Sequence, residues 1–206
     1  PGTAKNSVTV GMHQNRYSGA PDTIMSGSSR GPVDDGRIKP DVLAPGGYVR
    51  SCRAQEAGDT GGNSWSSQWY LEYTGTSMAT PNAAGASAMI RQYLEEIALR
   101  QSPQGALVKA LLILGAEDVG SPNIPNNNEG WGRINVRNSL APVDGQGIWV
   151  DDRSLLSATG NSKSYDFDID VANDAFKAVL TWSDEYASTN SNKQLVNNFA
   201  LEVTDP

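Results

Sequence analysis

The sequence predicts an α/β part over residues 1–146, followed by an antiparallel β domain over residues 147–206. Two observations support this division. The segment 82–100 is rich in Ala, Met, Ile and Leu, and apolar residues recur at i, i+3 and i+4 within 103–114, which is typical of helices. From about Gly147 the period changes to two, which is typical of strands with one face in water.

The first part of the chain is predicted to form strands and loops. Residues 1–50 carry short apolar runs separated by Gly- and Pro-containing turns. Residues 51–73 are predicted to be a polar loop with three interleaved aromatic side chains, Trp65, Trp69 and Tyr70. Such a loop can wall a substrate cleft, but we expect the rings to pack it onto the sheet, because buried aromatic rings mostly serve packing.

A helix is predicted to begin near Ser77, within the run Gly75-Thr76-Ser77-Met78-Ala79-Thr80-Pro81. Pro81 is expected in the first turn of this helix, where its missing N–H costs nothing. A serine at a helix N-terminus lies beside unpaired backbone N–H groups and the positive end of the helix dipole. Both stabilise negative charge on a carbonyl oxygen that the hydroxyl attacks, so this arrangement suits acyl transfer.

Three alternative roles for this serine fit the residues less well. Ser and Thr are common N-caps, but a cap does not require seven specified residues. The nucleophile turn of α/β-hydrolases needs Gly two residues after the serine, where this chain has Ala79. Penicillin-binding enzymes need Ser-x-x-Lys, and no serine of this chain has lysine three residues later.

A second helix is predicted after residue 101. Ser102 is its expected N-cap and Pro103 its expected first residue, because proline already lacks the N–H that a first turn leaves unpaired. Leu107 and Leu111 lie on its apolar stripe, and Gly115 ends it.

The run from Gly75 to Pro81 closely resembles the serine motif of the subtilisin-like proteases, or subtilases. This resemblance implies that Ser77 is the nucleophile, that the Thr76 hydroxyl supports the oxyanion, and that Gly75 and Met78 contact the substrate, Met78 on the leaving-group side. It also implies a subtilisin-like, mostly parallel sheet flanked by helices.

Other segments are similar to subtilases. Residues 28–46 resemble the connection before the serine helix, and within them Arg30 and Asp41 are expected to form a charge pair. Residues 126–135 resemble the segment that closes many subtilase catalytic domains. One departure is Asn82, where many members have His.

A serine nucleophile needs a general base that a third group orients. The single histidine, His13, ends an alternating run that resembles the subtilase strand following the oxyanion asparagine. The resemblance therefore places the triad Asp, the triad His and the oxyanion Asn upstream of these residues, and His13 is expected at a solvated loop position. We expect this chain to be the C-terminal part of a catalytic domain, to be inactive alone, and to need the N-terminal part of that domain as its partner.

The second part of the chain shows a clear two-residue alternation. Its apolar members Tyr165, Phe167, Ile169 and Val171 alternate with the acidic members Asp166, Asp168 and Asp170. Further strands are predicted at 178–182 and 199–203. This order of domains resembles alkaline subtilases that carry a C-terminal β-barrel or jelly roll.

Many subtilases bind structural calcium, which makes the three aspartates candidate ligands. An EF-hand loop needs Gly where this chain has Val171, and acidic residues along one strand face are usually solvated. Asp184 and the pair Asn197-Asn198 are weaker candidates. We assign no metal ligand and no cofactor.

The composition excludes some functions. With 16 basic and 23 acidic residues, the net charge of −7 argues against a nucleic-acid partner. No run approaches the roughly 20 apolar residues that span a bilayer, and the single cysteine, Cys52, is expected to be a buried apolar side chain. The resemblance implies a secreted serine endopeptidase that cuts polypeptides, and the alternative is a non-catalytic subtilase-like scaffold or a β-domain binding module.

Overall fold

A parallel pair of strands forms the centre of the molecule. In the computed structural model, which describes residues 1–15, 20, 23–56, 66–120, 123–140, 147–169 and 176–204, β1 (Val10–Gln14) pairs in parallel with β2 (Val42–Gly47). On its other side, β2 contacts the segment that contains Arg133. The Leu43 N–H donates to the Gly132 carbonyl oxygen at 2.8 Å, and the Ile134 N–H donates to the Leu43 carbonyl oxygen at 2.9 Å. The central strand β2 therefore has partners on both edges.

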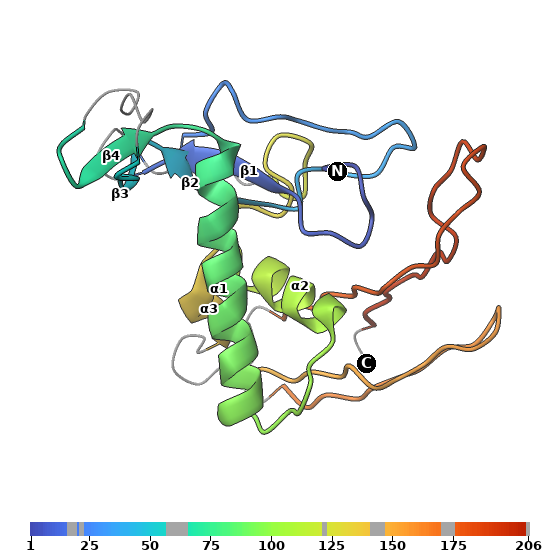
Figure 1. The fold of residues 1–206 in the computed structure, drawn as a ribbon. Helices are drawn as coiled ribbons and strands as arrows, with labels where there is room; N and C mark the ends of the chain where they lie inside the picture. The colour runs from blue at the N-terminus through green and yellow to red at the C-terminus, as the bar shows by residue number, and fades with distance from the viewer. Residues whose placement is uncertain are drawn as a thin grey trace.

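An antiparallel hairpin projects from the end of this sheet (Figure 1). It consists of β3 (Val49–Cys52) and β4 (Tyr70–Tyr73). The end of β3 and the whole of β4 lie in the stretch 51–73 predicted to be a polar loop. The expectation that the loop rings are packed is wrong for Trp69 and Tyr70, which are 58% and 50% exposed, and Trp65 lies outside the described residues. Cys52 is also exposed rather than buried, because it ends a strand at the tip of the hairpin, away from the core.

Within the described ranges, three helices accompany the strands. These are α1 (Thr76–Glu96), α2 (Gly105–Leu114) and the short α3 (Val136–Leu140). Two predicted boundaries need correction. Pro81 is the sixth residue of α1 rather than part of its first turn, and α2 begins two residues after Pro103, with Ser102 in a left-handed conformation of φ 52°. Gly115 ends α2 as predicted. None of the helices within the described ranges is long and apolar enough to cross a membrane.

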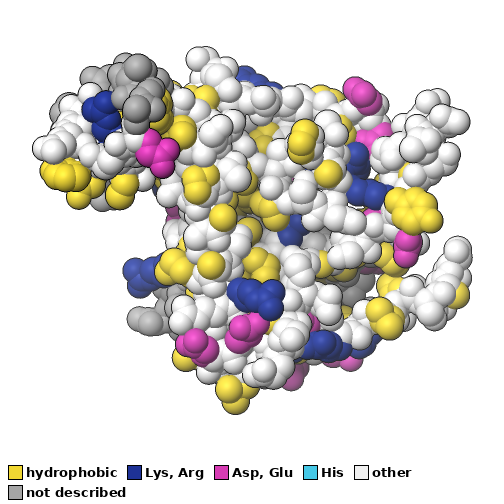
Figure 2. Space-filling view, in the orientation of Figure 1, with side chains coloured by type: hydrophobic (Ala, Val, Ile, Leu, Met, Phe, Trp, Pro, Cys, Tyr) yellow, Lys and Arg dark blue, Asp and Glu magenta, His cyan; other side chains and the backbone are white. Residues whose placement is uncertain are grey.

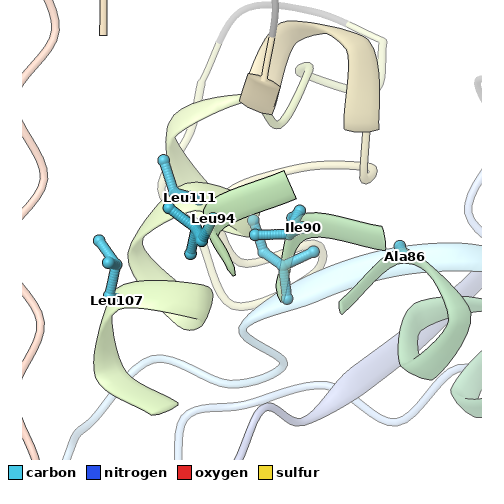
Figure 3. Packing of buried hydrophobic residues seen from close by; sticks show 6 residues of the cluster. Ala86, Ile90, Leu94, Leu107 and Leu111 are labelled. Atoms are coloured by element: carbon cyan, nitrogen blue, oxygen red, sulfur yellow. The ribbon is translucent and has the colours of Figure 1, made fainter. Parts of the chain in front are cut away.

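The core lies between α1, the sheet and α2. Near its N-terminus, α1 buries Ala79 and Ala83 against Met12 of β1 and Ala44 of β2. Further along, α1 meets the leucines of α2 in a second cluster, which Figure 3 shows: Ala86, Ile90, Leu94, Leu107, Leu111 and Leu112. The small residues allow the start of α1 to approach the sheet closely, whereas the larger ones fill the wider gap to α2.

A buried carboxylate fixes the start of β2. Asp41 is 3% exposed and accepts from Lys39 Nζ at 2.6 Å, Lys109 Nζ at 2.8 Å and the Thr9 N–H at 2.7 Å. Burial lowers the pKa of Lys39 although Asp41 opposes this shift. The expected pairing of Arg30 with Asp41 is therefore wrong. Arg30 reaches outward to the Asn128 side chain, at 3.1 Å, because Lys39 and Lys109 already surround the carboxylate.

The C-terminal residues run in extended form along and away from this body (Figure 1). No residue within 147–169 or 176–204 belongs to a strand, so the β sandwich stays a prediction. The two-residue alternation does place Tyr165 and Phe167 on one side, with ring centroids 4.5 and 5.4 Å from that of Trp149. Asp166 and Asp168 are exposed, as a solvated face requires, while Asp170 and Val171 lie outside the described residues.

One turn of this C-terminal segment is anchored to the N-terminus. The Asp184 carboxylate accepts from Lys5 Nζ at 2.6 Å and from the N–H groups of Val196 and Asn197, both at 2.9 Å. The Asn6 side chain also exchanges two hydrogen bonds with the Asp184 backbone, at 2.8 and 2.9 Å. Burial alone would raise the pKa of Asp184, but these hydrogen bonds outweigh it and hold the pKa well below its usual value.

We therefore expect Asp184→Asn to lower the free energy of unfolding by about 2–3 kcal/mol at pH 7, because Lys5 loses its charged partner in a buried site. Since the folded-state pKa of Asp184 is depressed, its stabilisation is present above the usual carboxyl pKa and is lost as the pH falls toward the folded value. Denaturant titration at pH 7 and pH 3 should show a smaller difference between variant and wild type at pH 3. Asp168→Asn, at an exposed site, is the control, and an equal loss in the two variants would contradict this prediction.

Candidate active site

Ser77 is the second residue of α1 and follows the N-cap residue Gly75 by two positions. Its side chain is exposed, and its hydroxyl has no hydrogen-bond partner among the described residues. The first turn of α1 closes through the Gly75 carbonyl oxygen, which accepts from the N–H groups of Met78 at 3.0 Å and Ala79 at 3.3 Å. The N–H groups of Thr76 and Ser77 make no hydrogen bond within the described part of the chain, so they remain available to an anionic ligand.

The end of β2 holds this turn in place. The Gly75 N–H donates to the Gly46 carbonyl oxygen at 2.9 Å. A Cβ at Gly46 would lie 2.5 Å from Met12 Cβ and 2.8 Å from the Gly75 carbonyl oxygen, so only glycine permits this approach. The exposed hydroxyl is thereby fixed at the C-terminal end of a buried strand.

The other predicted site residues share the same turn. Thr76 and Met78 flank Ser77 and are half-buried, and Gly75 precedes them. The Thr76 carbonyl oxygen accepts from the Thr80 hydroxyl at 2.9 Å. The Thr76 hydroxyl itself has no hydrogen-bond partner among the described residues. All four predicted residues, Gly75 to Met78, therefore lie at the start of α1, and their chemical roles stay predictions.

His13 does not lie at a solvated loop position, and that expectation is wrong. It belongs to β1, is 5% exposed, and its Nδ1 lies 2.6 Å from the Gln14 carbonyl oxygen. It is buried because β1 is covered by β2 and by the bridge to Ile24. No hydrogen bond joins the His13 ring to Ser77, and the described ranges hold no His, Cys, Asp and Glu cluster with the geometry of a metal site.

The outward face of α1 beside Ser77 is uncharged. From Thr76 to Ile90 the helix has no acidic or basic residue, and apart from Asn82 its exposed members in the middle turns are small or apolar: Pro81, Ala84, Gly85, Ala88 and Met89. Figure 2 shows this upper part of α1 in yellow and white, with charged side chains only further along the helix. An apolar helix face in open solvent indicates a surface that another segment covers.

One residue near Ser77 was not predicted to matter. The Asn82 side chain donates from Nδ2 to the Met78 carbonyl oxygen and to the Pro45 carbonyl oxygen, each at 3.0 Å. Sequence patterns carry no signal for the contact with Pro45, because residue 45 is distant along the chain.

Comparisons with known proteins agree with this geometry. The model of the subtilase family matches residues 1–132. The serine protease AprX of Bacillus subtilis (strain 168) is 36% identical over 152 residues, covering 68% of this chain and 31% of AprX. The serine protease/ABC transporter B family protein tagD of Dictyostelium discoideum is 29% identical over 241 residues, covering 89% of this chain and 13% of tagD.

A solved structure shares the fold. Fervidolysin from Fervidobacterium pennivorans, a keratinolytic enzyme related to subtilisin, superposes with a TM-score of 0.51 at 23% identity, over 68% of this chain and 20% of fervidolysin. This chain therefore spans less than a third of the length of each of these three proteins.

The contact at Gly46 yields a matched pair of variants. Gly46→Ala should lower the free energy of unfolding by about 1–3 kcal/mol, because its methyl group meets the Gly75 carbonyl and Met12 in a close-packed site. Gly85→Ala, within α1, has no atom within 4 Å of the added Cβ and should stabilise by about 0.5–1 kcal/mol. Denaturant unfolding of the two variants measures both effects, and a neutral Gly46→Ala would show that the close approach does not constrain the helix start.

Proposed function

The chain belongs to the subtilase family of serine proteases, and from this we propose that it supplies the nucleophile of a serine endopeptidase, with Ser77 as the attacking residue. The observation that carries the proposal is the exposed hydroxyl of Ser77 at the N-terminus of α1, which no described residue binds, with the N–H groups of Thr76 and Ser77 beside it. A helix N-terminus that presents both a free hydroxyl and free N–H groups can form a covalent bond to a carbonyl carbon and stabilise its oxyanion.

The proposed reaction is peptide-bond hydrolysis through an acyl-enzyme. Ser77 Oγ attacks the scissile carbonyl, and the Ser77 N–H and the Thr76 hydroxyl stabilise the oxyanion. Gly75 and Met78 contact the substrate, with Met78 on the leaving-group side. A histidine, an aspartate that orients it, and an oxyanion asparagine come from a part of the catalytic domain outside these residues. The histidine takes the Ser77 proton and returns it to the leaving amine.

The uncharged face of α1 supports an active site shared between these residues and another part of the catalytic domain. Burial of Ala84, Ala88 and Met89 under the N-terminal part of the same catalytic domain would remove apolar surface from water beside Ser77 and bring the base within reach. The sheet supports the same partner, because parallel sheets are normally covered on both faces. In this proposal the protease acts outside the cell on polypeptides.

The C-terminal residues are proposed to begin the antiparallel β-sandwich domain that follows the catalytic part at residue 147. The arrangement of Tyr165 and Phe167 on one side of their segment, both against Trp149, supports this proposal. Further strands would cover these rings.

Ser77 should be the residue that reacts with a fluorophosphonate probe in the full-length protein. Ser28 and Ser87 serve as controls, since Ser28 Oγ accepts from the Met12 N–H at 3.0 Å and Ser87 donates to the Ala83 carbonyl oxygen at 2.8 Å. Peptide mapping should find the label on Ser77, and Ser77→Ala should abolish it while Ser87→Ala leaves it unchanged. Label on another serine, or none on folded full-length protein, would favour a non-catalytic scaffold.

Residues 1–206 alone should not hydrolyse peptides at a protease-like rate. Without a base Ser77 is a neutral alcohol, and removal of the histidine costs subtilisin itself roughly a millionfold in kcat. Peptidase assays of the isolated chain, with and without an added N-terminal segment of the catalytic domain, should give turnover only on mixing. Robust turnover by the isolated chain would instead return His13 to consideration as the base.

A further inference from the structure

The side chain of Asn82 joins the nucleophile helix to the central strand. Its Nδ2 donates to the Met78 carbonyl oxygen within α1 and to the Pro45 carbonyl oxygen in β2, each at 3.0 Å. An amide NH₂ group has two hydrogens, so both bonds form at the same time. Asn82 is exposed, so packing in the core does not explain its position.

The helix needs this support because its own hydrogen bonding is interrupted at the nucleophile. In a regular helix the Ser77 carbonyl oxygen would accept from the N–H of residue 81, but Pro81 has none. The turn that carries Ser77 therefore lacks one of the bonds that fix its geometry. The Asn82 side chain donates to the carbonyl oxygen of Met78, the next residue of the same turn.

Two contacts then hold this turn against adjacent residues of β2. The Gly75 N–H donates to the Gly46 carbonyl oxygen at 2.9 Å before Ser77, and Asn82 donates to the Pro45 carbonyl oxygen after it. Ser77 lies between the two attachments. Loss of either would allow the turn to rotate relative to the strand, whereas the apolar contacts of Ala79 and Ala83 would still hold the helix in place.

We infer that Asn82 is a positioning residue for the Ser77 hydroxyl, an inference that rests on the proposed role of Ser77 as nucleophile. An exposed hydrogen bond contributes little to stability, but a displacement of about 1 Å at a reacting group lowers the rate roughly a hundredfold. Asn82 should therefore affect the reactivity of Ser77 far more than the stability of the fold.

The test uses the full-length protein with four variants. Asn82→Ala removes the amide, Asn82→Asp keeps its shape but removes the donor, and Asn82→His restores an N–H donor. Gln92→Ala is the control on the same helix, because Gln92 is exposed and bonds only to Glu96 among the described residues. The measurements are the rate constant of fluorophosphonate labelling, kcat and KM on a peptide substrate, and the unfolding temperature.

We expect Asn82→Ala and Asn82→Asp to lower kcat and the labelling rate constant about tenfold or more, with KM and the unfolding temperature close to wild type. Asn82→His should recover most of the loss, and Gln92→Ala should show none. If the wild type labels at Ser77 and both donor-free variants label at the same rate, Asn82 positions nothing and the inference is wrong. A loss that follows the unfolding temperature and that Asn82→His does not restore would also overturn it, whereas a wild type that does not label would remove the proposed function itself.

Discussion

The position of Ser77 depends on how closely the C-terminal end of β2 approaches the start of α1. Gly46 has no side chain, so the Gly75 carbonyl and Met12 can occupy the space beside it. The Gly75 N–H then bonds the Gly46 carbonyl oxygen, and the helix begins at the next residue, Thr76. Because β2 is hydrogen-bonded on both edges, a rigid strand rather than a loop sets the place of Ser77.

The other end of β2 is fixed by charge. Asp41, just before the strand, holds Lys39 and Lys109, and Lys109 belongs to α2. The same helix packs its leucines against α1 (Figure 3). The strand and both helices thus form a closed set of contacts, polar at the start of β2 and apolar along the helices. A buried charge pair of this kind adds little net stability, but loss of one partner is costly, so it favours one arrangement of the three elements.

The C-terminal segment is joined to this body by polar contacts, while much of its apolar surface stays exposed. Asp184 is held by Lys5 and by N–H groups of its own segment. Leu155 and Tyr186, in contrast, are 90% and 89% exposed. The polar anchor fixes where the segment meets the helices and strands of the preceding residues, while many of its apolar side chains stay in water. The Asp184 carboxylate, a weak candidate metal ligand in the sequence, is already paired with the Lys5 ammonium group.

The sequence by itself determined the features that depend on neighbouring residues: the serine at a helix N-terminus, the leucine stripe of α2 and its end at Gly115. Each follows from local spacing, and the match at Gly75 to Pro81 was sufficient to identify the family. Only the tertiary structure decided which distant groups meet. It gave Asp41 two lysines instead of Arg30, buried His13 inside β1, and placed Pro81 deep enough in α1 to deprive the Ser77 carbonyl of its donor. These outcomes depend on how closely chain segments approach across the fold, because burial and hydrogen-bond partners are set by three-dimensional neighbours and not by separation along the chain.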